Sequence, residues 1–220
     1  MTMMERFSPR RVLKSIRAKA SVELCSRWPI LSLIWRARRY NDILLSCESL
    51  KIIIDTVKKK APCRFLIFGL GNDSTLWSKV NRYGKTVFLE DNESWMRDVL
   101  KRNSLLTAYL VKYGTLRTEW SSYLESPEKL HMNLPDEIER EKWDVILVDG
   151  PNGHDDSSPG RMKSIFLAWK LSSDTDIFVD DCDRMIEQIY CDRFLKDENL
   201  KAKVDELRHY HLPASSKESY

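Results

Sequence analysis

The sequence predicts an α/β fold in which helices cover both faces of a mostly parallel sheet. Short, continuous apolar runs recur between residues 64 and 180, and segments with helical spacing lie between them. Such runs are typical of strands buried on both faces, and their alternation with helices indicates parallel pairing. With 220 residues, 42% of them hydrophobic, the chain is long enough for one such domain.

Residues 1–60 predict a basic helical extension that precedes this domain. Helix-breaking residues are few there, and 41–60 carries apolar side chains at helical spacing. Residues 1–40 hold ten Lys and Arg against Glu5 and Glu23, so this arm is strongly basic while the rest of the chain is acidic. We expect it to contact an anionic partner such as a membrane surface, the alternative being a solvated helical arm.

The elements after residue 60 follow one another at regular intervals. The α/β domain is expected over 61–213, and a flexible serine-rich tail over 214–220. Apolar runs predict strands at 64–71, 86–90, 107–111, 143–149 and 175–180, with a further candidate at 207–212. Helical patterns occupy 74–82, 93–103, 160–171 and 184–196.

Two motifs at the ends of the first two strands predict a nucleoside-bearing cofactor. The first strand ends in a glycine turn that begins at Gly69 and Gly71, which let a ligand approach the backbone closely. Glu90 ends the second strand, 19 residues after Gly71, where an acidic side chain can accept hydrogen bonds from a ribose. The combination is more specific than either half, and the alternative for Glu90 is a solvated side chain.

Carboxylates follow the next two long strands. Asp149 ends one of them, and Asp180, Asp181 and Asp183 follow the other, so all four are expected at one sheet edge. Clustered carboxylates repel each other unless a cation or a shared proton offsets their charge. They therefore predict either a divalent metal or a general base with a raised pKa, and some of them merely cap helices.

Five blocks in this order resemble the plant glucuronoxylan 4-O-methyltransferase family, formerly a domain of unknown function in polysaccharide biosynthesis proteins. The blocks read FLIFGLGNDSTLW (65–77), TVFLEDNESW (86–95), WDVILVDGPNG (143–153), PGRM (159–162) and DIFVDDCDR (176–184), with a weaker HYHLP at 209–213. The resemblance implies a Rossmann-like fold and an S-adenosylmethionine-dependent O-methyltransferase that acts on a hydroxyl of a sugar or uronic acid in a glycan.

The resemblance also implies roles for particular residues. The cofactor would be held by Gly69, Gly71, Asn72, Asp73, Ser74, Glu90, Asp91 and Asp149. The acceptor side would include His154, Arg161 and Asp183. The family pattern has His at the position of Asn72, Tyr-His-Asp at 154–156 and His-Asp at 180–181. The residues expected to bind the cofactor therefore match the family pattern better than those expected to bind the acceptor.

A sugar hydroxyl is a poor nucleophile and needs a proton acceptor or a metal. The candidates for the base are Asp181, then Asp149 or His154, and Arg161 can pair with a carboxylate on the acceptor. A divalent Mg²⁺, Mn²⁺ or Ca²⁺ held by Asp149, Asp180 and Asp181 is the alternative source of activation.

Other functions remain open at this point. The acceptor could be a small metabolite, a lipid-linked glycan or a protein, and a non-catalytic module could bind an anionic polymer through its basic arm. The chain shows no motif that reads nucleic acid bases, and no secretory or anchoring segment near Met1. We therefore expect a cytoplasmic protein, with peripheral contact to an anionic membrane through residues 1–40.

Overall fold

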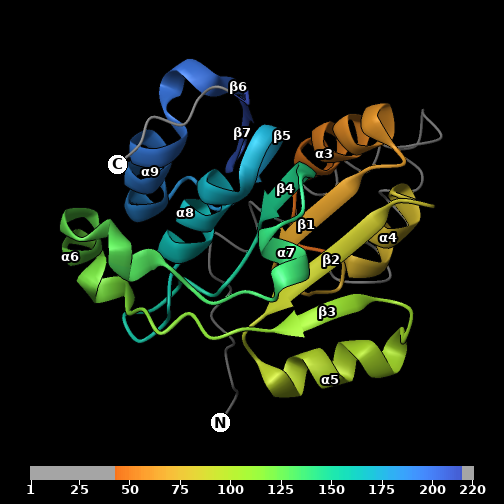
Figure 1. The fold of residues 1–220 in the computed structure, drawn as a ribbon, viewed down its shortest axis with the longest axis horizontal. Coiled ribbons are helices and arrows are strands. Elements are labelled where there is room, and N and C mark those ends of the chain that lie inside the picture. Colours follow the sequence, from red (N-terminus) through yellow and green to blue (C-terminus); the bar gives the residue numbers. More distant parts are fainter. Residues whose placement is uncertain (1–42, 215–220) are drawn as a thin grey trace, which may run out of the picture. The chain divides into compact units, whose positions relative to one another are not determined.

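A computed structural model describes residues 43–214 of the chain (Figure 1). The chain divides into two compact units, Met1–Lys51 and Ile52–Tyr220, and the division falls within helix α3 (Cys47–Lys60). The predicted basic arm at 1–40, with its expected membrane contact, and nearly all of the predicted tail lie outside the described residues. Among the helices at 43–214, none is both long and apolar enough to cross a membrane.

Seven strands form one sheet, in the order β3-β2-β1-β4-β5-β7-β6. Strands β1 to β5 pair in parallel, and β7 is antiparallel to both of its neighbours, which confirms the predicted fold class. The strands are β1 (Arg64–Phe68), β2 (Lys85–Glu90), β3 (Thr107–Leu110), β4 (Trp143–Val148), β5 (Ser172–Val179), β6 (Leu200–Val204) and β7 (Leu207–Leu212).

The register of the central strands brings their carboxyl ends to one level. Phe68 of β1 lies opposite both Leu89 of β2 and Val148 of β4, and Val148 lies opposite Val179 of β5. The next residue of each strand or loop therefore lies at the same edge of the sheet. These four residues are Gly69, Glu90, Asp149 and Asp180.

Helices cover both faces of the sheet, as predicted. Leu66 and Phe68 of β1 belong to a buried cluster that includes Ile165 of helix α8 (Met162–Leu171). Phe65, whose side chain points to the opposite face, makes an edge-to-face contact with Trp77 of helix α4 (Ser74–Val80), at 6.1 Å between ring centroids. Helices α8 and α4 thus bury opposite faces of the same strand.

The other elements agree with the sequence only in part. Helix α5 (Glu93–Arg102) and helix α9 (Met185–Tyr190), which continues as a π-helical turn (Cys191–Leu195), confirm two predicted helices. The sequence did not indicate strand β6 or the short helices between β3 and β4 and before β6. These helices are η1 (Arg117–Glu119), α6 (Trp120–Glu125), η2 (Pro127–Leu130), α7 (Asp136–Glu139) and η4 (Asp197–Asn199).

A buried ionic cluster joins α3, β5 and β7 far from the carboxyl ends of the strands. Asp176 accepts hydrogen bonds from Lys60 Nζ at 2.5 Å and from His209 Nε2 at 2.7 Å. Burial alone would raise the pKa of Asp176, but its bonds with His209 and Lys60 lower this pKa to about 2. His211 lies beside it, 3.3 Å from the exposed carboxylate of Asp174.

Replacing Asp176 by asparagine is expected to destabilise the protein by roughly 1–2 kcal/mol at pH 7. Because the folded-state pKa of Asp176 lies below its usual value, its contribution is complete above about pH 4 and is lost as the pH falls towards 2. Denaturant unfolding at pH 7 and pH 3 measures this, and the gap between wild type and variant should narrow at pH 3. Asp174→Asn is the matched control, and an equal loss there would contradict the prediction.

Candidate active site

The loops after β1 and β4 touch through their backbones at the carboxyl edge of the sheet. Gly69 has φ of +111°, and a Cβ at this position would lie 3.0 Å from the carbonyl oxygen of Asp149. A Cβ on Gly150 would lie 2.9 Å from the Cα of Gly69. Only glycine fits at both positions, because the two loops touch there through their backbones.

The turn that follows Gly69 is shaped by its own side chains. Ser74 Oγ accepts a hydrogen bond from Gly71 N at 2.8 Å, and Asp73 Oδ2 accepts one from Trp77 Nε1 at 2.8 Å. Burial, together with the charge of Asp180, raises the pKa of Asp73. Asn72 lies on the outside of the turn and accepts a hydrogen bond from Arg102 at 3.3 Å.

Glu90 connects this turn to the loop after β2. Its Oε2 accepts a hydrogen bond from Leu70 N at 3.0 Å, and its Oε1 accepts bonds from Asp91 N at 3.1 Å and Asn92 N at 2.8 Å. Glu90 is only 7% exposed, and burial raises its pKa despite these bonds. The second lone pair of Oε2 remains available for a ligand hydroxyl, whereas Asp91 itself is exposed.

Trp95 is a residue of this region that the sequence analysis left without a role. Its indole Nε1 donates to the carbonyl oxygen of Leu70 at 2.6 Å, and its ring lies 5.4 Å below the guanidinium of Arg102. The ring is 38% exposed, so an aromatic face stands next to the glycine turn. Its inclusion in the block TVFLEDNESW was the one available signal.

The three carboxylates predicted to bind a metal converge instead on the side chain of Arg161. Its guanidinium lies 2.5 Å from Asp181 Oδ2, 3.2 Å from Asp149 Oδ1 and 4.0 Å from Asp180 Oδ2. Arg161 precedes α8 and its side chain is only 6% exposed. The positive charge that the sequence analysis assigned to a metal ion is supplied here by an arginine, so these residues do not fit the predicted metal site.

Asp149 and Asp180 form an acidic pair that titrates near neutrality. Burial is the main cause that raises the pKa of each to about 7, and the charge of the other acidic groups adds to it, while Arg161 opposes the shift. The side chains are 28% and 16% exposed, so both can be reached from solvent. A carboxylate with a pKa near 7 is well matched to a general base at neutral pH.

Asp181, the first candidate for the base, is already engaged. Its Oδ2 pairs with Arg161 and also with Arg184 Nη2, at 2.8 Å, and its backbone has φ of +58°. Arg184 Nη2 also donates to Nδ1 of His154 at 2.9 Å, which places His154 on the exposed rim. Asp181 is therefore paired closely with two arginines, whereas Asp180 lies 4.0 Å from its arginine.

Asp183 is exposed, in the loop after β5. Its carboxylate, that of Asp181 and that of Glu206 have oxygens within 4.8 Å of one another, which is a spacing that a metal ion could use. Asp183 and Glu206 are both exposed, and exposed acidic groups commonly lie this close without an ion.

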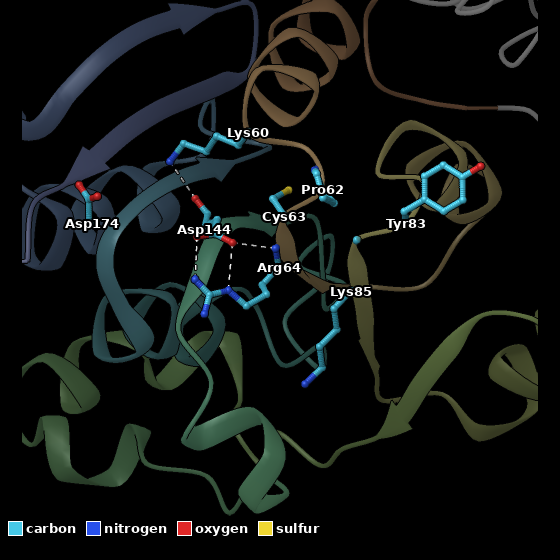
Figure 2. A pocket seen from close by; sticks show the side chains of 9 residues that line it. Lys60, Pro62, Cys63, Arg64, Tyr83, Lys85, Asp144 and Asp174 are labelled. Carbon is cyan, nitrogen blue, oxygen red and sulfur yellow. Dashed lines mark hydrogen bonds and ion pairs between the residues drawn. The ribbon is translucent and has the colours of Figure 1, made fainter.

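A hollow of about 670 Å³ lies at the opposite edge of the sheet, where β1, β2 and β4 begin (Figure 2). Its charged side chains are paired with each other or with neighbouring groups. Asp144 accepts two side-chain hydrogen bonds from Arg64, at 2.9 and 3.0 Å, and Lys85 pairs with Glu141 at 2.8 Å. None of the residues predicted for the cofactor or the acceptor lines this hollow.

Comparisons with known proteins agree with this geometry. The chain is 36% identical over 178 residues to glucuronoxylan 4-O-methyltransferase 1 of Arabidopsis thaliana, which covers 71% of this chain and 63% of that protein. It is 34% identical over 194 residues to arabinogalactan O-methyltransferase 2 of the same plant, covering 76% of this chain and 67% of the relative. The chain thus spans about three-fifths of the length of the glucuronoxylan relatives.

The fold is shared with a solved structure. A putative caffeoyl-CoA O-methyltransferase from Staphylococcus aureus superposes with a TM-score of 0.52 at 10% sequence identity, over 89% of this chain and 99% of the other. The model of the family described as IRX15/IRX15L/GXM matches residues 48–131 and 121–210. With its fold, its glycine turn and its carboxylates in place, the chain belongs to the IRX15/IRX15L/GXM family.

Proposed function

We propose that the protein is an S-adenosylmethionine-dependent O-methyltransferase that methylates a hydroxyl of a uronic acid or other sugar in a glycan. One observation carries the proposal: the strand register brings four residues side by side at the carboxyl edge of the sheet. These residues are Gly69, Glu90, Asp149 and Asp180. Ligands of open α/β sheets bind at this edge. Two relatives are named as O-methyltransferases of glucuronoxylan and of arabinogalactan, and both of these substrates are glycans. These names support a glycan as the acceptor.

The glycine turn and Glu90 fit the cofactor. At Gly71, where a Cβ would meet only Asp73 Oδ1, the backbone is open to a ligand, and the free lone pair on Glu90 Oε2 can accept a hydrogen bond from a ribose hydroxyl. Asp149, beside Gly69, offers a negative charge to the positively charged end of the cofactor. The exposed ring of Trp95 offers a surface on which a planar base can stack.

Methyl transfer requires that the acceptor lose a proton. When bound, S-adenosylmethionine would supply a methyl group on a sulfonium, for transfer to an acceptor oxygen with S-adenosylhomocysteine as the leaving group. Asp180 is placed to take the hydroxyl proton, because its pKa of about 7 lets it be ionised at neutral pH and still hold a proton well. Arg161 holds Asp149 and Asp181 in position and offsets their charge. A metal ion has no part in this scheme, because Arg161 lies where the carboxylates converge.

Calorimetry with S-adenosylmethionine, followed by transfer of a labelled methyl group to a panel of acceptors, tests the proposal. We expect micromolar binding and methylation of glycans that contain uronic acid, with S-adenosylhomocysteine as the second product. Absence of cofactor binding would leave a non-catalytic module as the function. Transfer only to small metabolites, lipid-linked glycans or proteins would overturn the proposed acceptor.

Replacing Glu90 by alanine is expected to weaken cofactor binding by more than tenfold. The change removes a ligand acceptor and also releases the amides of Leu70, Asp91 and Asn92, and each charge-assisted hydrogen bond contributes about 1.5–3 kcal/mol. Calorimetry on the folded variant measures the affinity. Glu93→Ala, which removes an exposed carboxylate three residues further on, is the control and should bind normally. Equal affinity in folded Glu90→Ala and wild type would remove Glu90 from the site.

A further inference from the structure

Two arginines share one oxygen atom of Asp181. Asp181 Oδ2 lies 2.5 Å from Arg161 and 2.8 Å from Arg184. The two guanidiniums differ in surroundings, because Arg161 is also paired with Asp149, while the Nη2 group of Arg184 reaches the exposed rim through His154. Arg184 is therefore the cation of this cluster that a ligand can reach from the rim.

Arg184 also has hydrogen-bonding capacity that the protein does not use. Its Nη1 is buried and has no hydrogen-bond acceptor, and it lies 4.0 Å from Glu187 Oε1. Glu187 is only 1% exposed, and neither of its carboxylate oxygens has a hydrogen-bond partner. The loop at Gly153 closes over both groups, since a Cβ there would lie 3.0 Å from Arg184 Nη1. The charges of Asp181 and Glu187 thus hold the guanidinium of Arg184 between them, with Nη1 on the buried side and Nη2 toward the rim.

We propose that Arg184 determines acceptor specificity by binding the carboxylate of a uronic acid, and that Asp181 occupies this position while no acceptor is bound. The inference rests on the proposed function and names the feature of the acceptor that is recognised. A guanidinium donates strong, charge-assisted hydrogen bonds to a carboxylate, and Nη2 is the group of Arg184 that lies toward the exposed rim. Asp181 keeps Arg161 as a partner after the exchange, so no buried charge is left unpaired.

The backbone of Asp181 supports this exchange. Its φ of +58° lies in the left-handed region, which residues other than glycine adopt uncommonly, aspartate and asparagine more readily than most. Residues held in this way cluster at ligand-binding sites, where the surrounding structure maintains them. Here the two ion pairs of Asp181 are the visible restraint on its side chain, and an acceptor carboxylate replaces one of them.

The chemistry of a uronic acid explains why this position suits methyl transfer. In a hexuronic acid the 4-hydroxyl stands on the ring carbon next to the one that bears the carboxylate. A carboxylate bound at Arg184 Nη2 therefore brings the neighbouring hydroxyl close to Asp181 and to Asp180, its neighbour in the chain. A neutral sugar has no anionic group that can replace the charge of Asp181 on Arg184, so it gains much less of this positioning.

The experiment compares two acceptors that differ in one group. A xylo-oligosaccharide with a single glucuronic acid branch is titrated against the same oligosaccharide whose carboxylate has been reduced to an alcohol, in the presence of S-adenosylhomocysteine. We expect wild type to bind the acid form at least tenfold more tightly than the reduced form. Arg184→Gln should lose most of this preference while its affinity for S-adenosylhomocysteine stays within about twofold, and Arg184→Lys should retain part of it.

Arg140→Gln is the matched control. Arg140 also pairs with an aspartate of its own segment, Asp136, but it lies before β4, whereas the site lies after the carboxyl end of that strand. This variant should keep the full preference for the acid form. Equal binding of the two oligosaccharides by wild type, or an equal loss for both in folded Arg184→Gln, would overturn the inference. A separate measurement tests the proposed function itself. If wild type transfers no methyl group to either oligosaccharide, the proposed function is wrong, whatever the binding preference.

Discussion

Replacing Asp180 by asparagine is expected to lower kcat for methyl transfer at pH 7 by about 100- to 10,000-fold, the usual contribution of a general base. The amide has nearly the size of the carboxyl group but cannot accept the proton of the acceptor hydroxyl. Cofactor affinity should change much less, because Glu90 and the glycine turn are untouched. Single-turnover measurements with saturating cofactor isolate this step from binding.

The same assignment predicts how kcat changes with pH. A base must be ionised to act, and the pKa of Asp180 is raised to about 7, so kcat in wild type should rise with pH through this value and then level off. The residual activity of Asp180→Asn should lack this rise. Asp98→Asn, an exposed site on α5, controls for the loss of a carboxylate elsewhere. If Asp180→Asn keeps the profile and Asp181→Asn loses it, Asp181 is the base, as the sequence alone suggested.

Replacing Arg161 by glutamine is expected to destabilise the folded protein by about 2–4 kcal/mol at pH 7.5, since it removes a buried cation from three partly buried carboxylates. Arg161 is nearly fully buried and pairs with Asp149 and Asp181. Arg97→Gln, which removes an exposed ion pair with Glu93, should cost about 0.5 kcal/mol and serves as the control. Denaturant unfolding of both variants measures the difference.

The loss in Arg161→Gln should shrink as the pH falls. Arg161 opposes the raised pKa values of Asp149 and Asp180, so its removal raises both values further. A carboxyl group whose folded-state pKa is raised favours the folded state when protonated, so the variant recovers stability as the pH falls from 7.5 towards 5. A loss that is the same at pH 5 and pH 7.5 would show that Arg161 acts through packing rather than charge.

Most of the sheet could be predicted because its central strands are buried on both faces. The run FLIF of β1 and the run VILV of β4 are continuous apolar stretches that leave little choice of structure. Strand β6 reads LKAKV and is half-buried at the sheet edge, so it has no such run. Between β3 and β4, the prolines at 127 and 135 interrupt the chain, and short turns replace any long helical period.

The cofactor half of the site could be predicted and the acceptor half only in outline. Gly69 and Glu90 take their positions from the strands that they follow, and strand ends can be read from a sequence. The partners of Arg161 and Arg184 depend on how two loops fold over each other. Arg184 meets His154 across 30 residues, and no spacing rule predicts that an arginine occupies the place assigned to a metal.

The three amide hydrogen bonds to Glu90 have a consequence for the dynamics of the empty protein. They fix the backbone of Leu70, Asp91 and Asn92 before any ligand arrives, so binding costs little loss of conformational entropy in these loops. Amides held in this way exchange with solvent only when the loop opens. The amide of Leu70 should therefore exchange slowly even without cofactor, and a ligand should slow it little further, because the loop already holds the shape that it keeps in the complex.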